Sequence, residues 1–351
     1  MRDVRRNRPG KRSNQHQKTS AHTQDKKRTI HLLLNRTNLL ALNTGSLAYV
    51  SVIWDAQPAG EILQTRLVPI TISTAPTIVS AHTCNKISDG DGRSRRLKIK
   101  VLGASGSEVP GKNCPAFLVD ESLLLDAGTI GLALNIREEN SLKQILLTHA
   151  HFDHIKGIPF LLDNLVVRDT GNTITVMSGK EVIDDLKENI FNDRIWPDFS
   201  KIPTPENPVL KYQSISPTHP VDLNGYRVFM QKVHHTVPAY GYIILQGNGT
   251  AVAYTGDTGP TDLFWRLMSS HDVQCLIVEV SFPNRLGELA LISGHLTPAL
   301  LEKEIGKMSP CPSRIFVMHI KPQYHGEIEK EVHALRRNGV ELLKEGSTIT
   351  I

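Results

Sequence analysis

The feature that most constrains this chain is a six-residue segment, His149 to His154, which reads His-Ala-His-Phe-Asp-His. Imidazole nitrogens and carboxylate oxygens bind borderline and hard divalent metals such as zinc, manganese and iron. In extended backbone, residues two apart project to the same side, so His149 and His151 can bind one ion. Asp153 and His154 then face another direction and can reach a second ion. A solvated histidine cluster on a polar loop is the alternative interpretation.

Apolar residues flank this segment on both sides. Residues 144–147 form a short apolar run that predicts a strand, and residues 155–162 form a longer run that predicts a helix. The metal-binding candidates are therefore expected on a strand-to-helix turn, where side chains can converge on a cavity.

The spacing His149-x-His151-x-Asp153-His154 resembles the signature of the metallo-β-lactamase superfamily. The resemblance implies an α/β fold, the αβ/βα four-layer sandwich, in which two mixed β-sheets are flanked by helices. It implies two divalent metal ions at one sheet edge, with zinc modestly favoured and manganese or iron also compatible. It further implies a third histidine for the first metal, an aspartate that bridges both metals, and a last histidine for the second.

The chain contains a matching residue for each of these three places. His235 lies in the segment 233–242, Asp257 in the apolar segment 251–258, and His319 in the apolar segment 314–322. The metal ligands that the resemblance implies are therefore His149, His151, Asp153, His154, His235, Asp257 and His319. We interpret the neighbouring His234 as a supporting or solvated residue.

An aspartate in the bridging place narrows the choice of branch. Lactam-cleaving members typically place cysteine there, so the resemblance argues against an antibiotic hydrolase. Taken alone, Asp257 in its Gly-Asp-Thr segment would be interpreted as a turn former. The six other candidate ligands favour a metal-binding role instead.

One more histidine lies in a segment that resembles the phosphodiesterase branches of this superfamily. His295 lies just before Thr297 and Pro298, which predict a helix start, and it follows an apolar strand that contains Glu279. In those branches a non-ligand histidine contacts the scissile phosphate and a glutamate orients it, which assigns these roles to His295 and Glu279. Asp126 resembles the carboxylate that fixes a ligand tautomer. The alternatives are an exposed loop histidine for His295 and a plain turn residue for Asp126.

Two phosphodiesterase branches are candidates, the class II cyclic-nucleotide phosphodiesterases and the tRNA 3′-end endonuclease ribonuclease Z. The endonuclease usually carries a long arm between the third histidine and the bridging aspartate, whereas 22 residues separate His235 from Asp257 here. From about Leu97 to Ile351 the chain is similar to bacterial proteins of the cyclic-nucleotide type. The chain departs from the pattern of that family at Phe152, where the family favours leucine, and over residues 159–164. These departures bear on the identity of the substrate and not on the metal centre.

The resemblance implies hydrolysis of 3′,5′-cyclic AMP or GMP to the 5′-monophosphate by a hydroxide held between two metals. Asp153 belongs to the catalytic set, and His295 would protonate the leaving ribose oxygen, an effect typically worth ~10²–10⁴-fold. The alternatives are a ribonuclease Z-like endonuclease, another small-phosphodiester hydrolase, and a non-catalytic metal- or nucleotide-binding module. A thioester hydrolase related to glyoxalase II is disfavoured, because residues 237–242 lack that family's Gly-His-Thr type of run.

Substrate recognition is expected from an aromatic and proline-rich segment, residues 191–205, which follows a predicted helix over about 180–190. Trp196 or Phe199 could stack on a purine. Arg194 and Lys321 are candidate partners of the phosphate. Packing beneath a surface loop is the alternative for the two aromatic side chains.

Positive charge is concentrated at the N-terminus. Residues 1–28 contain ten Lys or Arg and two Asp, a local charge of +8, so the rest of the chain carries −3 of the formal total of +5. A mildly acidic body disfavours a polynucleotide substrate, which normally requires a basic surface. We predict a basic, poorly ordered extension over residues 1–95 and a catalytic domain over residues 96–351. Deletion of the extension should leave folding and turnover intact.

Cysteine usage and hydropathy indicate the compartment. The four cysteines, Cys84, Cys114, Cys275 and Cys311, show no CxxC spacing and predict reduced thiols in a cytoplasmic protein. Residues 39–54 are too interrupted by polar residues for a membrane-spanning helix. The expected partner is a small cyclic nucleotide rather than a nucleic acid or a membrane, and a homodimer is compatible with the family.

Overall fold

The computed structural model describes residues 48–51, 67–70 and 96–351, with residue 336 excepted. The chain divides into two units, residues 1–81 and residues 82–351. In the first unit, β1 (Ala48–Ser51) and β2 (Leu67–Ile70) pair antiparallel. The rest of the predicted N-terminal extension, and Cys84 with it, lies outside the described residues.

The second unit is built on two seven-stranded sheets. The first sheet has the order β16 (Thr348–Thr350), β3 (Lys98–Gly103), β4 (Ala116–Val119), β5 (Leu123–Leu125), β6 (Gln144–Leu146), β7 (Ile174–Ser178) and β8 (Leu210–Ser214). The second has the order β15 (Val340–Leu342), β14 (Arg314–Met318), β13 (Val273–Glu279), β12 (Ala251–Tyr254), β11 (Tyr240–Gln246), β10 (Tyr226–Lys232) and β9 (Val221–Leu223).

Each sheet is mixed in the same way. From β16 to β5 the neighbours are antiparallel, and from β5 to β8 they are parallel. From β9 to β12 the neighbours are antiparallel, and from β12 to β15 they are parallel. Two mixed sheets flanked by helices were predicted from the sequence, and the structure confirms this fold.

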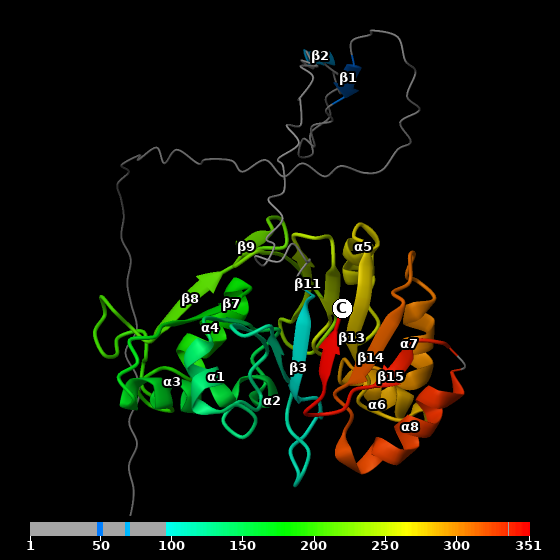
Figure 1. Cartoon of the computed structure of the whole chain (residues 1–351). Coiled ribbons are helices and arrows are strands. Elements are labelled where there is room, and N and C mark those ends of the chain that lie inside the picture. Colours follow the sequence, from blue (N-terminus) through cyan, green and yellow to red (C-terminus); the bar gives the residue numbers. More distant parts are fainter. Residues whose placement is uncertain (1–47, 52–66, 71–95, 336) are drawn as a thin grey trace, which may run out of the picture. The chain divides into compact units, whose positions relative to one another are not determined.

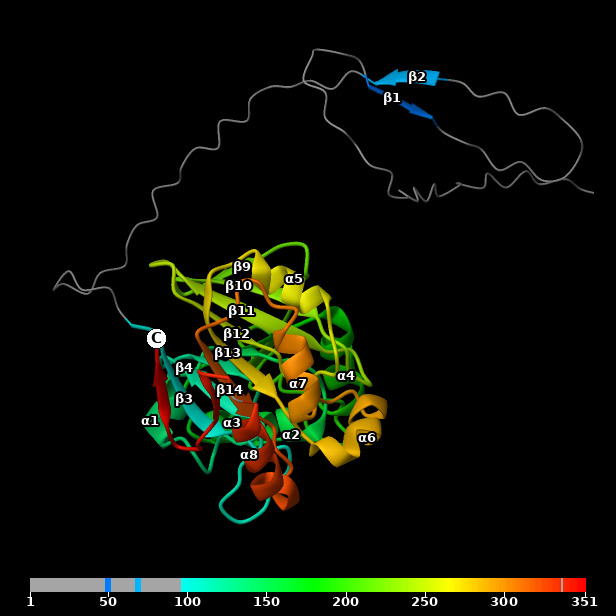
Figure 2. The same ribbon diagram turned by 90° about the vertical axis from the view of Figure 1, so that its right-hand side faces the viewer.

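Helices cover the outer faces of the two sheets. The first sheet carries α1 (Ile136–Ser141), α2 (Phe152–Ile155), α3 (Gly157–Val167) and α4 (Lys180–Asn189), and Figure 1 shows this group on one side. The second sheet carries α5 (Leu263–Ser269), α6 (Gly287–Ile292), α7 (Pro298–Ile305) and α8 (His325–Ala334), with two short 3-10 turns, η1 (Asn284–Leu286) and η2 (Pro322–Tyr324). Figure 2, turned by 90°, shows α7 and α8 in front of the second sheet.

The core lies between the sheets. Every residue of β4, β5 and β12 is buried, as expected for strands that are covered on both faces. Phe117 of β4 and Tyr254 of β12 meet across the two sheets, edge to face, with 5.3 Å between ring centroids. Cys114 and Cys275 are buried unpaired thiols, and Cys311 is an exposed one.

The parallel halves of the sheets determine where polar side chains gather. The carboxyl ends of parallel strands share one edge, and the loops that leave them form binding sites in α/β proteins. Asp126 directly follows β5, His149 follows β6, and Asp257 follows β12, whereas Glu279 ends β13 and His319 directly follows β14. In the ranges that the structure describes, no helix combines the length and apolar character needed to span a bilayer.

Candidate metal centre

Seven side chains from four segments of the chain converge at this edge. His149, His151, His235 and Asp257 form one group, and Asp153, His154, Asp257 and His319 form a second; within each group the ligand atoms lie within 4.8 Å of one another. Asp257 belongs to both groups. The structure thus brings together all seven residues that the resemblance named as metal ligands, with the aspartate between the two sets.

The spacing within the first group suits a small cation. His151 Nδ1 lies 3.1 Å from His149 Nε2 and 3.2 Å from His235 Nε2. Tetrahedral coordination at about 2.0–2.1 Å from a zinc ion separates two ligand nitrogens by about 3.3 Å. Asp257 Oδ2 lies 3.7 Å from His149 Nε2. The donor set and its spacing therefore fit one divalent ion.

The second group is similar but richer in carboxylates. His319 Nε2 lies 3.2 Å from Asp153 Oδ2 and 3.2 Å from Asp257 Oδ2. His154 Nε2 lies 3.2 Å from Asp257 Oδ1. The oxygens of Asp257 thus face histidines of both groups, which is the arrangement that a carboxylate shared by two ions requires.

Two buried atoms give an independent test of metal binding. His154 Nε2 and Asp257 Oδ1 are 3.2 Å apart, but their geometry is not that of a hydrogen bond, and neither atom has another hydrogen-bond partner among the described residues. A buried polar atom without a partner costs about 1–3 kcal/mol. A cation bound by this group would satisfy both atoms, so the residues fit the divalent metal ions that the fold implies.

The pKa of His154 is shifted in the opposite direction to the pKa values of His149, His151 and His235. Burial opposes protonation of His154, but the carboxylates of Asp257 and Asp126 outweigh it and raise the pKa of His154 well above its usual value. Burial lowers the pKa of His149, His151 and His235. These three imidazoles are therefore neutral near pH 7, as metal ligation requires.

Outer hydrogen bonds orient four of the five histidines in the two groups through the ring nitrogen that faces away from the centre. The partners are Thr148 Oγ1 for His149 (3.0 Å), Asp126 Oδ2 for His154 (2.7 Å), Gly294 O for His235 (2.9 Å) and Ser281 Oγ for His319 (2.8 Å). Such partners set the tautomer and the ring direction of a ligand. Asp126 also accepts from Tyr254 Oη at 2.6 Å and from Thr148 N at 2.7 Å, so its carboxylate is held in turn.

Two residues of the site have a rare backbone conformation. Asp126 and His319 have φ of 54° and 62°, values in the left-handed region that non-glycine residues rarely adopt. Strain of this kind persists only where the surroundings enforce it, and it is concentrated at functional sites. Next to His319, a Cβ on Gly106 would lie 2.4 Å from the His319 carbonyl oxygen, so this close approach requires glycine.

His295 lies beside the centre and belongs to neither of these two groups, although it forms a third cluster of possible ligand atoms with Glu279 and His319. Its ring centroid is 5.0 Å from that of His235 and 5.4 Å from that of His319. His295 Nδ1 donates to Glu279 Oε1 at 2.7 Å. Burial lowers the pKa of His295, but the charge and hydrogen bond of Glu279 more than offset it and leave the pKa raised. The arrangement therefore suits a proton donor.

Ser281 is a residue that the sequence patterns did not identify. Its fully buried hydroxyl lies 2.8 Å from His319 Nδ1 and 3.1 Å from Glu279 Oε2. A hydroxyl carries one proton and two lone pairs, so it can donate to Glu279 while accepting from His319. Its position two residues after Glu279 in extended chain, which puts both side chains on one side, was the available signal.

Replacement of Ser281 by alanine is expected to weaken metal binding by about 10–100-fold, as found for other outer hydrogen-bond partners of metal ligands. The loss follows because His319 would no longer be held in the tautomer that presents Nε2. Competition against a chelator, followed by metal analysis, measures the effect. Ser293→Ala, which removes a hydroxyl bonded to the carbonyls of Leu289 and Ala290, is the matched control; equal affinities in the two variants would contradict the role of Ser281.

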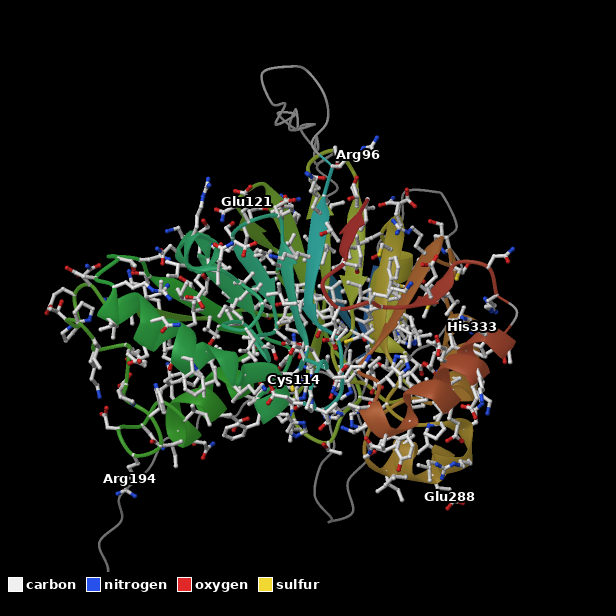
Figure 3. All side chains as sticks on the ribbon, turned by 60° about the horizontal axis from the view of Figure 1, so that its bottom comes forward. Arg96, Cys114, Glu121, Arg194, Glu288 and His333 are labelled. Carbon is white, nitrogen blue, oxygen red and sulfur yellow. The ribbon has the colours of Figure 1, made fainter. Side chains whose placement is uncertain are left out.

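The residues predicted to bind substrate lie in different parts of the structure, and not all of them lie beside the metal centre. Lys321 Nζ donates to Gly106 O at 2.7 Å, and its charge acts on His295, so it lies beside the site. Arg194 is exposed, and Figure 3 shows its side chain at the outer edge of the molecule. Trp196 is partly buried and packs edge-on against Phe160, with 5.6 Å between ring centroids. His234 is exposed and belongs to neither ligand group.

The prediction that Phe199 stacks on a purine is wrong. Its side chain is only 3% exposed and belongs to the hydrophobic core. It packs against Phe191, with 6.4 Å between ring centroids. The alternative, packing beneath a surface loop, is what the structure shows for this residue.

Comparisons with known proteins agree with this arrangement. A family profile described as "Beta-lactamase superfamily domain" matches residues 123–320. A probable 3′,5′-cyclic-nucleotide phosphodiesterase of Yersinia pestis is 26% identical over 207 residues, which are 52% of this chain and 58% of that protein. A ribonuclease Z of Sulfurisphaera tokodaii is 22% identical over 279 residues, 68% of this chain and 93% of that protein.

Solved structures show the same architecture. The crystal structure of unliganded yeast PDE1 matches with a TM-score of 0.63 at 17% identity, and the match covers 73% of this chain and 99% of that one. At this identity the likeness concerns the fold alone. The chain spans less than two thirds of the Yersinia pestis relative, so that protein's activity is not transferred by similarity.

Proposed function

We propose a function for this chain on the basis that it belongs to the metallo-β-lactamase superfamily. It is a metal-dependent phosphodiesterase that hydrolyses a 3′,5′-cyclic nucleotide to the 5′-monophosphate. Cyclic AMP and cyclic GMP are the proposed substrates. The observation that carries the proposal is the position of Asp257 between two ligand groups, with the His295–Glu279 pair beside them.

His149, His151 and His235 are the proposed ligands of one ion, and Asp153, His154 and His319 those of the other, with Asp257 shared. Zinc is the first choice because nitrogen and oxygen donors with tetrahedral spacing suit it, and manganese or iron are the alternatives. When bound, two such ions lower the pKa of water and neutralise charge on the phosphate oxygens.

The chain's own residues complete the reaction. The Asp153 side chain is 27% exposed, against 2% for that of Asp257, so its carboxylate can accept a hydrogen bond from the incoming water. Water adds to phosphorus as the bond to the ribose 3′-oxygen breaks. Because Nδ1 of His295 is bonded to Glu279, Nε2 is the atom that gives its proton to the leaving oxygen.

Charge and chain length favour a small substrate over tRNA. Residues 29–351 carry a formal charge of −3, which does not favour a polyanion. Between His235 and Asp257 the chain forms only β11, a short turn and β12, which leaves no room for an added arm in that interval. Ribonuclease Z activity is the second candidate, favoured by the match that covers 93% of the Sulfurisphaera tokodaii enzyme.

Turnover by the full-length protein tests the proposal. The protein is loaded with zinc, manganese or iron and offered cyclic AMP, cyclic GMP, bis-p-nitrophenyl phosphate and pre-tRNA. We expect a 5′-monophosphate from at least one cyclic nucleotide and loss of that activity with a chelator. Cleavage of pre-tRNA without turnover of cyclic nucleotides would favour the endonuclease, and metal binding without any turnover would favour a non-catalytic module.

We also propose that residues 96–351 are sufficient for catalysis. The family match over residues 123–320 and the boundary of the second unit at residue 82 support this assignment. Removal of residues 1–95 should therefore leave the rate unchanged.

A further inference from the structure

A cavity of about 300 Å³ lies at the N-terminal end of α3, close in the chain to Asp153 and His154. It is lined by residues of two loops and of the start of α3, among them Glu108, Gly128, Leu132, Lys156 and Phe160. Small-molecule sites are concave, mostly apolar and begin at about this volume. None of the roles described so far uses this cavity.

No candidate metal ligand lines this cavity, but several of its lining residues adjoin the second ligand group. Lys156 follows α2, which carries Asp153 and His154. Gly128 lies so close to the backbone of Asp153 that a Cβ would be 2.0 Å from the Asp153 carbonyl oxygen. Glu108 belongs to the loop in which Gly106 packs on His319. The lining residues therefore adjoin the segments that carry the second ligand group, where the phosphate of a nucleotide would bind.

The lining combines an apolar surface with a charged rim. Leu132 is 82% exposed and Phe160 is 61% exposed, and Trp196 supports the Phe160 ring from the side. Lys156 and Glu108 form an ion pair. A nucleobase matches both features, because its face stacks on aromatic and apolar groups and its edge carries donors and acceptors.

We propose that this cavity binds the base of the nucleotide, with the base stacked on Phe160 and its polar edge toward Lys156 and Glu108. The inference rests on the proposed cyclic-nucleotide activity and adds the location of the base. It also gives Trp196 a positioning role behind Phe160 in place of direct stacking.

A smaller cavity of about 150 Å³ is the competing location. It is lined by His151, Asp185 and Asn189, among others. It borders the first ligand group, but it presents the Asp185 carboxylate and no aromatic ring other than the candidate ligand His151. The smaller cavity therefore offers no aromatic side chain free to stack on a base, which favours the larger cavity.

Steady-state kinetics of the full-length, metal-loaded protein test the inference. Phe160→Ala and Leu132→Ser change exposed side chains and should leave the fold intact. We expect each to raise KM for the cyclic nucleotide about tenfold, with kcat within about twofold because the metal ligands are untouched. Ribose 3′,5′-cyclic phosphate without a base should show no such change. Val167→Ala, at a 77% exposed position on the same helix α3, is the matched control.

The outcomes separate the two proposals. If the wild-type protein hydrolyses cyclic nucleotides and both variants keep its KM, the base does not bind here and the proposed function stands. A higher KM for Asn189→Ala than for Phe160→Ala would place the base in the smaller cavity. An equal rise for the base-free substrate would also overturn the inference, since the wall would then act on the phosphate site. Absence of wild-type turnover of any cyclic nucleotide would overturn the proposed function itself.

Discussion

Asp257→Ala is expected to abolish turnover and to reduce bound metal from two ions per chain. Asp257 is 1% exposed, and its two oxygens face His149, His154 and His319 at 3.2–3.7 Å. Burial raises the pKa of Asp257, but His319 and His154 lower it well below its usual range, so the side chain supplies a negative charge. Its removal takes a ligand from both candidate ions.

The expected loss of rate is on the order of 10³-fold or more, equal to about 4 kcal/mol of transition-state stabilisation. Metal analysis of the purified variant, together with initial rates on a cyclic nucleotide, measures both effects. Asp262→Ala is the control, because its exposed carboxylate bonds Lys307 away from the centre. Full activity and two bound ions in Asp257→Ala would refute the shared ligand.

His295→Ala is expected to lower turnover of a cyclic nucleotide by ~10²–10⁴-fold, the range for loss of a general acid. The metal content should stay unchanged, because His295 is not one of the seven proposed ligands and its Nδ1 is bonded to Glu279. The ribose oxygen leaves as a strongly basic alkoxide unless it is protonated, whereas p-nitrophenolate is a stable leaving group. The variant should therefore lose much less activity on bis-p-nitrophenyl phosphate.

The comparison of the two substrates distinguishes an acid from a structural residue. A damaged fold would slow both reactions equally, and so would loss of metal. His333→Ala, at an exposed position on α8 labelled in Figure 3, controls for removal of an imidazole. Equal losses on both substrates would argue against proton donation by His295.

Local spacing accounts for the success of the sequence in identifying the fold and the candidate ligands. His149, His151, Asp153 and His154 lie within six positions, and Asp257 and His319 each follow an apolar strand. Parallel strands carry their carboxyl ends to one edge, which is why residues at such ends meet in the structure. The resemblance to the superfamily also assigned supporting roles to Asp126 and Glu279, each of which lies at a strand end.

Contacts between distant segments were beyond what spacing could reveal. Tyr254 bonds Asp126 across 128 positions, and Ser281 bonds His319 across 38. Phe199 and Trp196 lie three residues apart in one aromatic segment, yet the first is in the core and the second supports Phe160 at the surface. Their local sequences contain nothing that distinguishes these environments.

The sequence by itself determined the chemistry of this protein, namely the nitrogen and oxygen donors, their order along the chain and the strands that carry them. The tertiary structure decided which candidate donors lie together, which ring nitrogen of each histidine faces the other donors, and which residues line the nearby cavities. The physical reason is the distance along the chain over which the residues that determine each property are spread. Strand formation and ligand type depend on neighbouring residues, whereas burial, tautomer and pocket shape depend on packing between segments that are far apart in the chain.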